Sequence, residues 1–179
     1  MAIERLDRLI HPGPSLFISP ADEGDDSVLT SGILPSTGIA ATTQLDSIER
    51  EFLRLLNAYR QSRGLNALAP IEKVSLACSR HSFDMGTRGY LSHVSPEGQG
   101  PKQRLQAVGY PLPASWCENI AAGVRYSSAQ GVLNAWKASS GHNANLLRTG
   151  MRGVGVGRVV VSSSRYYVYW TLMLVSSAT

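Results

Sequence analysis

Two strand-like segments near the C-terminal end constrain the fold more than any other feature of this sequence. Residues 166–175 are apolar, aromatic or β-branched throughout, which is typical of a central, buried strand. Just before them, in residues 154–161, one set of alternate positions holds Val154, Val156, Arg158 and Val160, and the other holds Gly155, Gly157, Val159 and Val161. The serine-rich residues 162–165 then supply a turn. The two segments therefore predict a β-hairpin. No helix follows Gly153, Gly155 and Gly157, so a phosphate-binding loop is excluded, and close packing of a helix against the strand is favoured.

The sequence that precedes the hairpin carries helical patterns. Apolar residues recur at helical spacing from about Asp46, where Asp46 and Glu49 match a capping box. Further helices are expected over about 70–88, 101–108 and 128–139. Helices that precede and interrupt a strand meander predict an α/β or α+β layered domain.

Composition limits the class of protein. The chain has 179 residues, 43% of them hydrophobic, which suits one domain with a substantial core. Residues 1–44 show little periodicity and are expected to form an arm or linker, poorly ordered or docked, ahead of a domain at 45–179. The net charge of +4 comes from scattered basic residues, so a nucleic-acid partner is not expected. No signal-peptide pattern and no segment long enough for a transmembrane helix is visible.

Three residues in glycine- and serine-rich contexts are candidates for a functional site: His93, Glu118 and His142. Such contexts are typical of loops and element ends, where functional side chains project. Two imidazoles and a carboxylate are a common catalytic zinc set, and they also suit general acid–base catalysis. A third interpretation is that the three side chains hydrogen-bond and hold the loops together. No G-x-S-x-G motif supports a serine nucleophile.

In these segments the sequence resembles the CAP superfamily, the cysteine-rich secretory, antigen-five and pathogenesis-related-one proteins with SCP-like extracellular domains, and its bacterial branch in particular. The resemblance extends from about Leu53 to Val175. It rests on segments that occur in one order, at residues 56–60, 81–85, 92–98, 104–110, 118–121 and 136–146. It implies a three-layer α–β–α sandwich with a small antiparallel sheet between helices, in a secreted or cell-envelope protein.

The resemblance also assigns roles to the candidate residues. The family cleft carries two histidines and two acidic residues, and His93, Glu118 and His142 match three of the four. The position of the second glutamate is Ser139 here, so one anionic ligand is missing. A site of His93, His142 and Glu118 could still take zinc or another divalent cation, but it should hold magnesium or calcium poorly because these prefer several oxygen ligands.

Cys78 and Cys117 are the two cysteines of the chain. An even count permits one disulfide, and the alternative is two buried thiols. Because the resemblance implies an exported protein, a bridge between the two is expected.

The resemblance is compatible with several functions. The first hypothesis is an extracellular binding module whose cleft takes a lipid or sterol, a glycan or a peptide at the cell envelope. The second is a divalent-metal-dependent, protease-like hydrolase that uses His93, Glu118 and His142. The third is a structural domain of a larger exported protein. Fold alone does not select among them.

Overall fold

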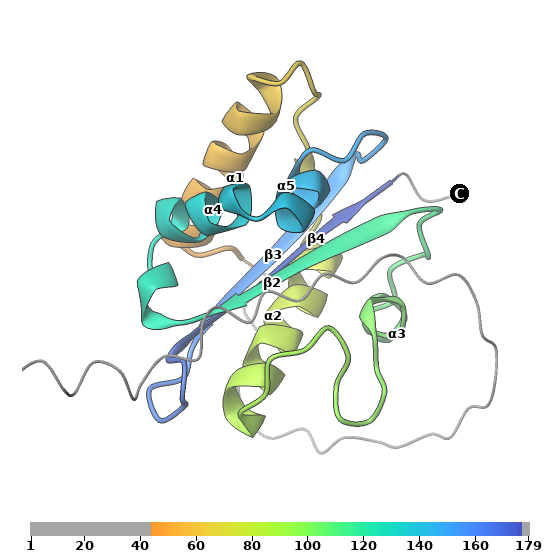
Figure 1. Cartoon of the computed structure of the whole chain (residues 1–179). Helices are drawn as coiled ribbons and strands as arrows, with labels where there is room; N and C mark the ends of the chain where they lie inside the picture. The colour runs from red at the N-terminus through yellow and green to blue at the C-terminus, as the bar shows by residue number, and fades with distance from the viewer. Residues whose placement is uncertain (1–43, 177–179) are drawn as a thin grey trace, which may run out of the picture.

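The structure, a computed structural model, describes residues 44–176, and Figure 1 shows how its helices and strands are arranged. The arm expected at residues 1–44 lies outside this range except for its last residue. The elements follow in the order α1 (Ser47–Gln61), β1 (Ala69–Pro70), α2 (Glu72–Arg88), α3 (Pro101–Ala107), β2 (Trp116–Ala122), the 3₁₀ turn η1 (Val124–Tyr126), α4 (Ala129–Ala138), α5 (Ser140–Leu146), β3 (Gly153–Val160) and β4 (Val168–Val175).

The four strands form one sheet in the order β1-β3-β4-β2. β3 and β4 pair antiparallel, as the predicted hairpin, and β2 pairs antiparallel with the other edge of β4. β4 is therefore central, and each of its residues is buried, as its apolar composition predicts. β1 contributes two residues that pair parallel with β3, so the sheet is mixed where a purely antiparallel one was expected.

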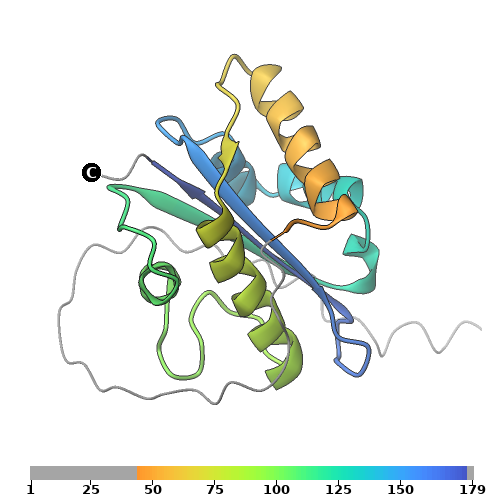
Figure 2. The same cartoon turned by 180° about the vertical axis from the view of Figure 1, so that it is seen from behind.

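Helices cover both faces of the sheet, and the two views in Figures 1 and 2 show α1, α4 and α5 on one face and α2 and α3 on the other. On the first face, Phe52 lies with its ring centroid 5.5 Å from those of both Trp136 and Trp170. On the second face, Val74, Leu105 and Met173 share a separate buried cluster. The predicted three-layer α–β–α sandwich is confirmed.

The glycines of β3 allow α2 to approach the sheet closely, as the sequence predicts. A Cβ atom on Gly155 would lie 2.4 Å from the backbone nitrogen of Ser75, and one on Gly157 would lie 2.2 Å from that of Ser79. Any side chain at either position would therefore overlap the helix backbone.

The expected bridge between Cys78 and Cys117 is absent, and both cysteines are free and buried. Cys78 belongs to the cluster under α2, whereas Cys117 belongs to the cluster on the opposite face of the sheet. Each thiol donates to a carbonyl on its own side, Cys78 to Gly155 at 3.5 Å and Cys117 to Asn145 at 3.7 Å. The sheet separates the two sulfur atoms, which sequence spacing alone does not reveal.

Candidate functional site

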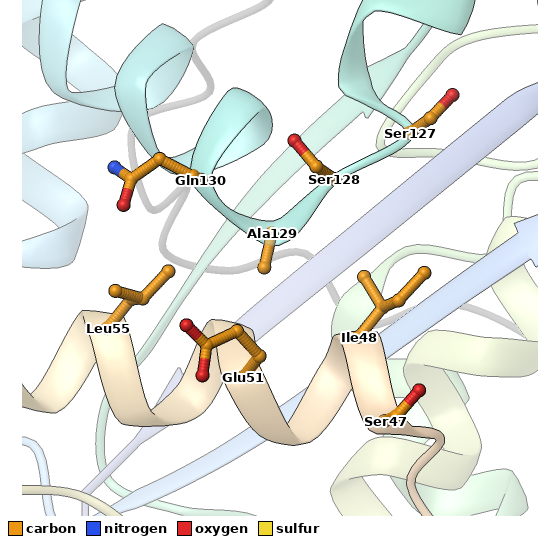
Figure 3. Close-up of a pocket in the computed structure, with 8 residues that line it drawn as sticks. All are labelled: Ser47, Ile48, Glu51, Leu55, Ser127, Ser128, Ala129 and Gln130. Atoms are coloured by element: carbon orange, nitrogen blue, oxygen red, sulfur yellow. The ribbon is translucent and has the colours of Figure 1, made fainter.

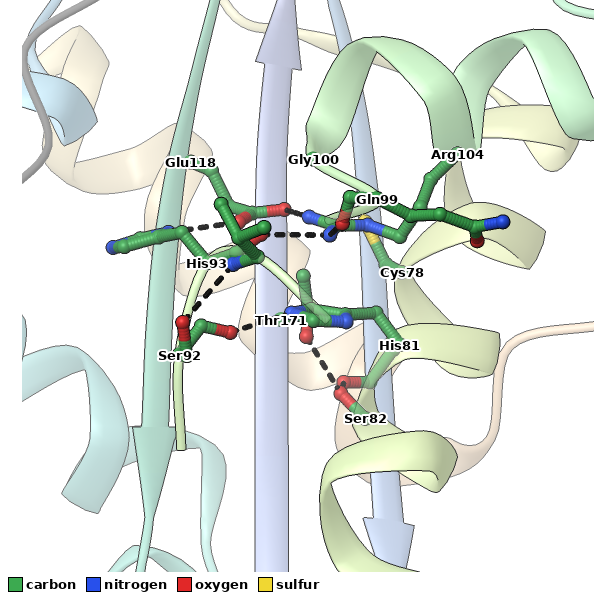
Figure 4. A network of polar contacts seen from close by, with 12 residues as sticks. Cys78, His81, Ser82, Ser92, His93, Gln99, Gly100, Arg104, Glu118 and Thr171 are labelled. Atoms are coloured by element: carbon green, nitrogen blue, oxygen red, sulfur yellow. Dashed lines mark hydrogen bonds and ion pairs between the residues drawn. The ribbon is translucent and has the colours of Figure 1, made fainter. Parts of the chain in front are cut away.

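Three buried side chains from three elements meet at the edge of the sheet: His93 in the loop after α2, Arg104 on α3 and Glu118 in β2 (Figure 4). His93 Nδ1 lies 2.8 Å from Glu118 Oε1, and Arg104 Nη2 donates to Glu118 Oε2 at 2.5 Å. Arg104 Nη1 also donates to the carbonyl oxygen of His93 at 2.8 Å. The arginine therefore holds the carboxylate and the backbone of the histidine loop together.

The electrostatics keep Glu118 ionised. Burial raises the pKa of this carboxyl group, but the Arg104 guanidinium and the hydrogen bond with His93 outweigh burial and bring the pKa down to about 2. Both carboxylate oxygens are engaged, one by each partner. Glu118 consequently positions His93 and neutralises Arg104.

A second histidine supports the same loop from α2. His81 is 2% exposed, and its Nε2–H donates to the carbonyl oxygen of Ser92 at 2.9 Å. Burial lowers the pKa of His81 to about 4, so the ring is neutral near pH 7. His81 is a structural residue that fixes the backbone next to His93.

His142 lies on α5, across the edge of the sheet from that network. Its Nδ1 is 2.8 Å from the hydroxyl oxygen of Ser139, and its buried Nε2 has no hydrogen-bond partner among the described residues. Burial, and then the charge of His93, lower the pKa of His142 to about 4. Asn119, next to Glu118 in β2, donates its Nδ2–H to the carbonyl oxygen of His142 at 3.1 Å, so the helix segment of His142 lies against the strand that carries Glu118. Ser139, at the position of the missing glutamate, orients His142 with a hydroxyl group.

The residues present do not fit a three-ligand zinc site. Within residues 44–176, no group of three or more His, Cys, Asp or Glu side chains is arranged to hold a metal ion. Glu118 is engaged by a guanidinium, which repels a cation from the same carboxylate. In the described part of the chain, His93 and His142 therefore have no third side chain arranged with them to hold a metal ion, and cation binding stays a prediction.

From the sequence, Arg104 on the segment at 101–108 could either pair with a carboxylate or be solvated, and the structure pairs it with Glu118. It occupies one position of a short helix, where an arginine is usually solvated. The signal that could have identified it is charge balance: a buried Glu118 requires a positive partner.

A separate groove lies between α1 and the start of α4, with a volume of about 410 Å³. Figure 3 shows Ile48, Leu55 and Ala129 directed into the space between the two helices. Polar residues complete the lining, and they are Ser47, Glu51, Ser127, Ser128 and Gln130. Sequence reasoning missed this groove because its apolar residues also fit the core-facing stripes of their helices.

Comparison with known proteins decides the family. The model of the cysteine-rich secretory protein family (CAP) matches residues 53–174. The chain belongs to this family. Its bacterial character, expected from the sequence, is supported by two Bacillus subtilis relatives, the proteins YkwD and YlbC. YkwD is 32% identical over 124 residues, which cover 69% of this chain and 47% of YkwD. YlbC, described as a membrane protein, is 32% identical over 109 residues, which cover 61% of this chain and 31% of YlbC.

Solved structures of bacterial proteins have the same fold. An extracellular protein of Bacillus anthracis that contains an SCP domain has a TM-score of 0.63 and 30% identity, over 72% of this chain and 40% of that one. An outer surface protein of Borrelia burgdorferi has a TM-score of 0.64 and 19% identity, over 74% and 96% of the two chains, which supports the fold alone. The chain spans less than half the length of the two curated relatives. Over the described residues, no helix is both long and apolar enough to cross a membrane.

Proposed function

We propose that this CAP domain is an extracellular lipid-binding module and that the groove between α1 and α4 holds an acyl chain. The observation that carries the proposal is the groove of about 410 Å³, in which Ile48, Leu55 and Ala129 provide apolar contact among five polar lining residues. Small-molecule sites in proteins commonly have volumes of about 300–1,000 Å³. The extracellular location rests on the family and on the description of the Bacillus anthracis protein.

The walls of the groove suit an acyl chain. Ile48 and Leu55 are half-buried and pack against the main core cluster, to which Ala129 belongs. An acyl chain in the groove would remove the exposed parts of these side chains from water, which is favourable by about 25 cal/mol per Å² of apolar surface. The side chain of Glu51 lies between Ile48 and Leu55 and accepts two hydrogen bonds from Arg54, and the seryl residues complete the lining.

Two of the alternatives, glycan binding and metal-dependent hydrolysis, match the structure less well. A glycan usually stacks on aromatic rings, and the groove has none among its lining residues. The hydrolase hypothesis needs Glu118 as a ligand or base, but both of its oxygens are engaged. We therefore advance lipid binding alone.

Titration with the fluorescent fatty acid cis-parinaric acid tests the proposal. The wild type should bind it saturably, and the double variant Ile48→Gln/Leu55→Gln should bind at least about tenfold more weakly, because amides replace two apolar walls. The matched control is Phe83→Gln, which makes a similar change at an exposed apolar residue of α2. Equal affinity of the wild type and the groove variant, or no saturable binding, would overturn the proposal.

A further inference from the structure

Three of the five exposed large hydrophobic side chains of the described chain lie at one end of the sheet. Val124 is 66% exposed, Val160 43% and Tyr167 41%. Their backbones are tied together, because Gly123 N donates to the carbonyl oxygen of Val168 at 2.9 Å and Val160 pairs with Val168. Figure 1 shows the loop between β3 and β4 extending past the sheet beside η1.

Two exposed arginines accompany these apolar residues. The Arg125 guanidinium lies 5.3 Å from the ring centroid of Tyr126, and that of Arg165 lies 5.3 Å from that of Tyr166. Neither arginine forms a salt bridge with a described residue. Both charges are therefore available to a partner.

The part of the sequence that contains this end of the sheet is basic, and so is the domain as a whole. From residue 119 to the C-terminus there is no Asp or Glu, but there are six Lys and Arg residues. Residues 44–176 together contain 15 basic and 7 acidic residues. An anionic surface is therefore attracted to this domain over a distance of about the Debye length.

The loop holds Tyr167 in an unusual conformation. It is the only non-glycine residue with positive φ, at 68°, in the described part of the chain. Its N–H donates to the hydroxyl oxygen of Ser164 at 3.1 Å, and its carbonyl oxygen accepts from Val161 at 2.8 Å. A non-glycine residue in this region costs about 1 kcal/mol or more and persists where the surroundings impose it. Here they keep the aromatic side chain of Tyr167 exposed, two residues after Arg165.

We propose that this end of the sheet, formed by Val124, Arg125, Val160, Arg165 and Tyr167 and called the hairpin end below, docks on an anionic lipid bilayer. Arginine is attracted to anionic headgroups, tyrosine favours the interface, and exposed valines add apolar contact at the acyl boundary. The combination of apolar, aromatic and unpaired cationic side chains matches this partner better than a neutral or cationic surface.

Docking in this orientation also has a consequence for the groove. Residues 127–130, which line one wall, follow η1 directly. The bilayer would therefore lie beside one end of the groove, where an acyl chain could enter. The docking surface does not require the groove, because the two share no residue.

Sedimentation with vesicles tests the hairpin end. The wild-type chain should bind vesicles of phosphatidylcholine and phosphatidylglycerol in equal parts, and bind pure phosphatidylcholine far more weakly. Arg125→Gln/Arg165→Gln should bind the anionic vesicles about 25-fold more weakly, since each arginine near the surface accounts for roughly fivefold. Tyr167→Gly removes the ring and suits the positive φ, so the fold is retained while binding falls by up to about tenfold.

The charge-matched control is Arg80→Gln/Lys102→Gln, which removes two exposed charges from α2 and α3. It should reduce vesicle binding by less than about threefold. Losses as large as those of the hairpin-end variant would indicate general attraction by net charge and overturn the proposal. Absence of wild-type binding, or a dimer in ultracentrifugation that Tyr167→Gly disrupts, would also overturn it. Fatty-acid binding in solution reports on the groove alone, so failure of either proposal can be recognised separately.

Discussion

At the scale of single residues, the arginine beside Glu118 determines what this carboxylate can do. Each carboxylate oxygen of Glu118 accepts one hydrogen bond, from His93 on one side and from Arg104 on the other. Its role is to keep His93 in place. The same interactions explain why a histidine and a glutamate that are 25 positions apart meet so closely.

Removing the positive partner should destabilise the domain. Arg104→Gln leaves Glu118 as a buried carboxylate with one partner fewer, which should lower the free energy of unfolding by about 3 kcal/mol. The double variant Arg104→Gln/Glu118→Gln should lose less than the sum of the two single variants, because no unbalanced charge is buried. Urea denaturation at pH 7 measures both, and additive losses would contradict the proposed coupling.

Two imidazoles without a third ligand should hold zinc weakly. We expect protein that was incubated with zinc and then gel-filtered to retain well below one equivalent, as measured by elemental analysis. The His142→Ala variant should retain a similar amount of zinc. If the wild type instead retained one equivalent of zinc, and if His93→Ala and His142→Ala each abolished it, the result would support the metal site considered from the sequence.

At the scale of elements, the contact between α2 and β3 depends on the glycines. Gly157→Ala places a methyl group 2.2 Å from the backbone of Ser79, which the helix cannot accommodate without moving, so a loss of about 3 kcal/mol in unfolding free energy is expected. Gly64→Ala is the control, because its Cβ meets open space and only its φ of 73° is unfavourable, at about 1 kcal/mol. Thermal or urea denaturation compares them, and equal losses would show that overlap with α2 is not the cause.

The elements could be predicted from the sequence where local rules act. Asp46 accepts from Glu49 N at 2.7 Å, and Glu49 Oε2 accepts from Asp46 N at 2.8 Å, as the capping-box pattern predicts. The apolar strand and the glycine-lined strand were likewise recognised from periodicity and composition. The predicted disulfide was wrong because it depends on which face of the sheet each cysteine occupies. Cys117 points away from Cys78, since side chains alternate between the two faces along β2. The groove and the choice of Glu118 as the partner of Arg104 also arise from tertiary packing that no single segment encodes.

At the scale of the whole molecule, protonation of buried histidines should set its response to mild acid. The pKa of His81 falls from 6.5 to about 4 on folding, mainly through burial. The unfolded chain therefore binds more protons than the folded one between these values, and stability that is complete above pH 6.5 is lost as the pH falls toward 4. The His81 contribution amounts to about 3 kcal/mol over the full range, and His142 acts in the same direction.

Other groups make a comparison of variants necessary. Glu118 adds a loss only below about pH 4.5, since its pKa is lowered, whereas burial raises the pKa of Glu49 and opposes the trend. In His81→Gln the amide can still donate to Ser92, but it does not titrate. The urea midpoint of the wild type should fall between pH 7 and pH 5, and that of the variant should fall less. An equally steep fall in both proteins would mean that His81 is not a major cause, and the acid sensitivity would then have to arise elsewhere, with His142→Gln as the next variant to measure.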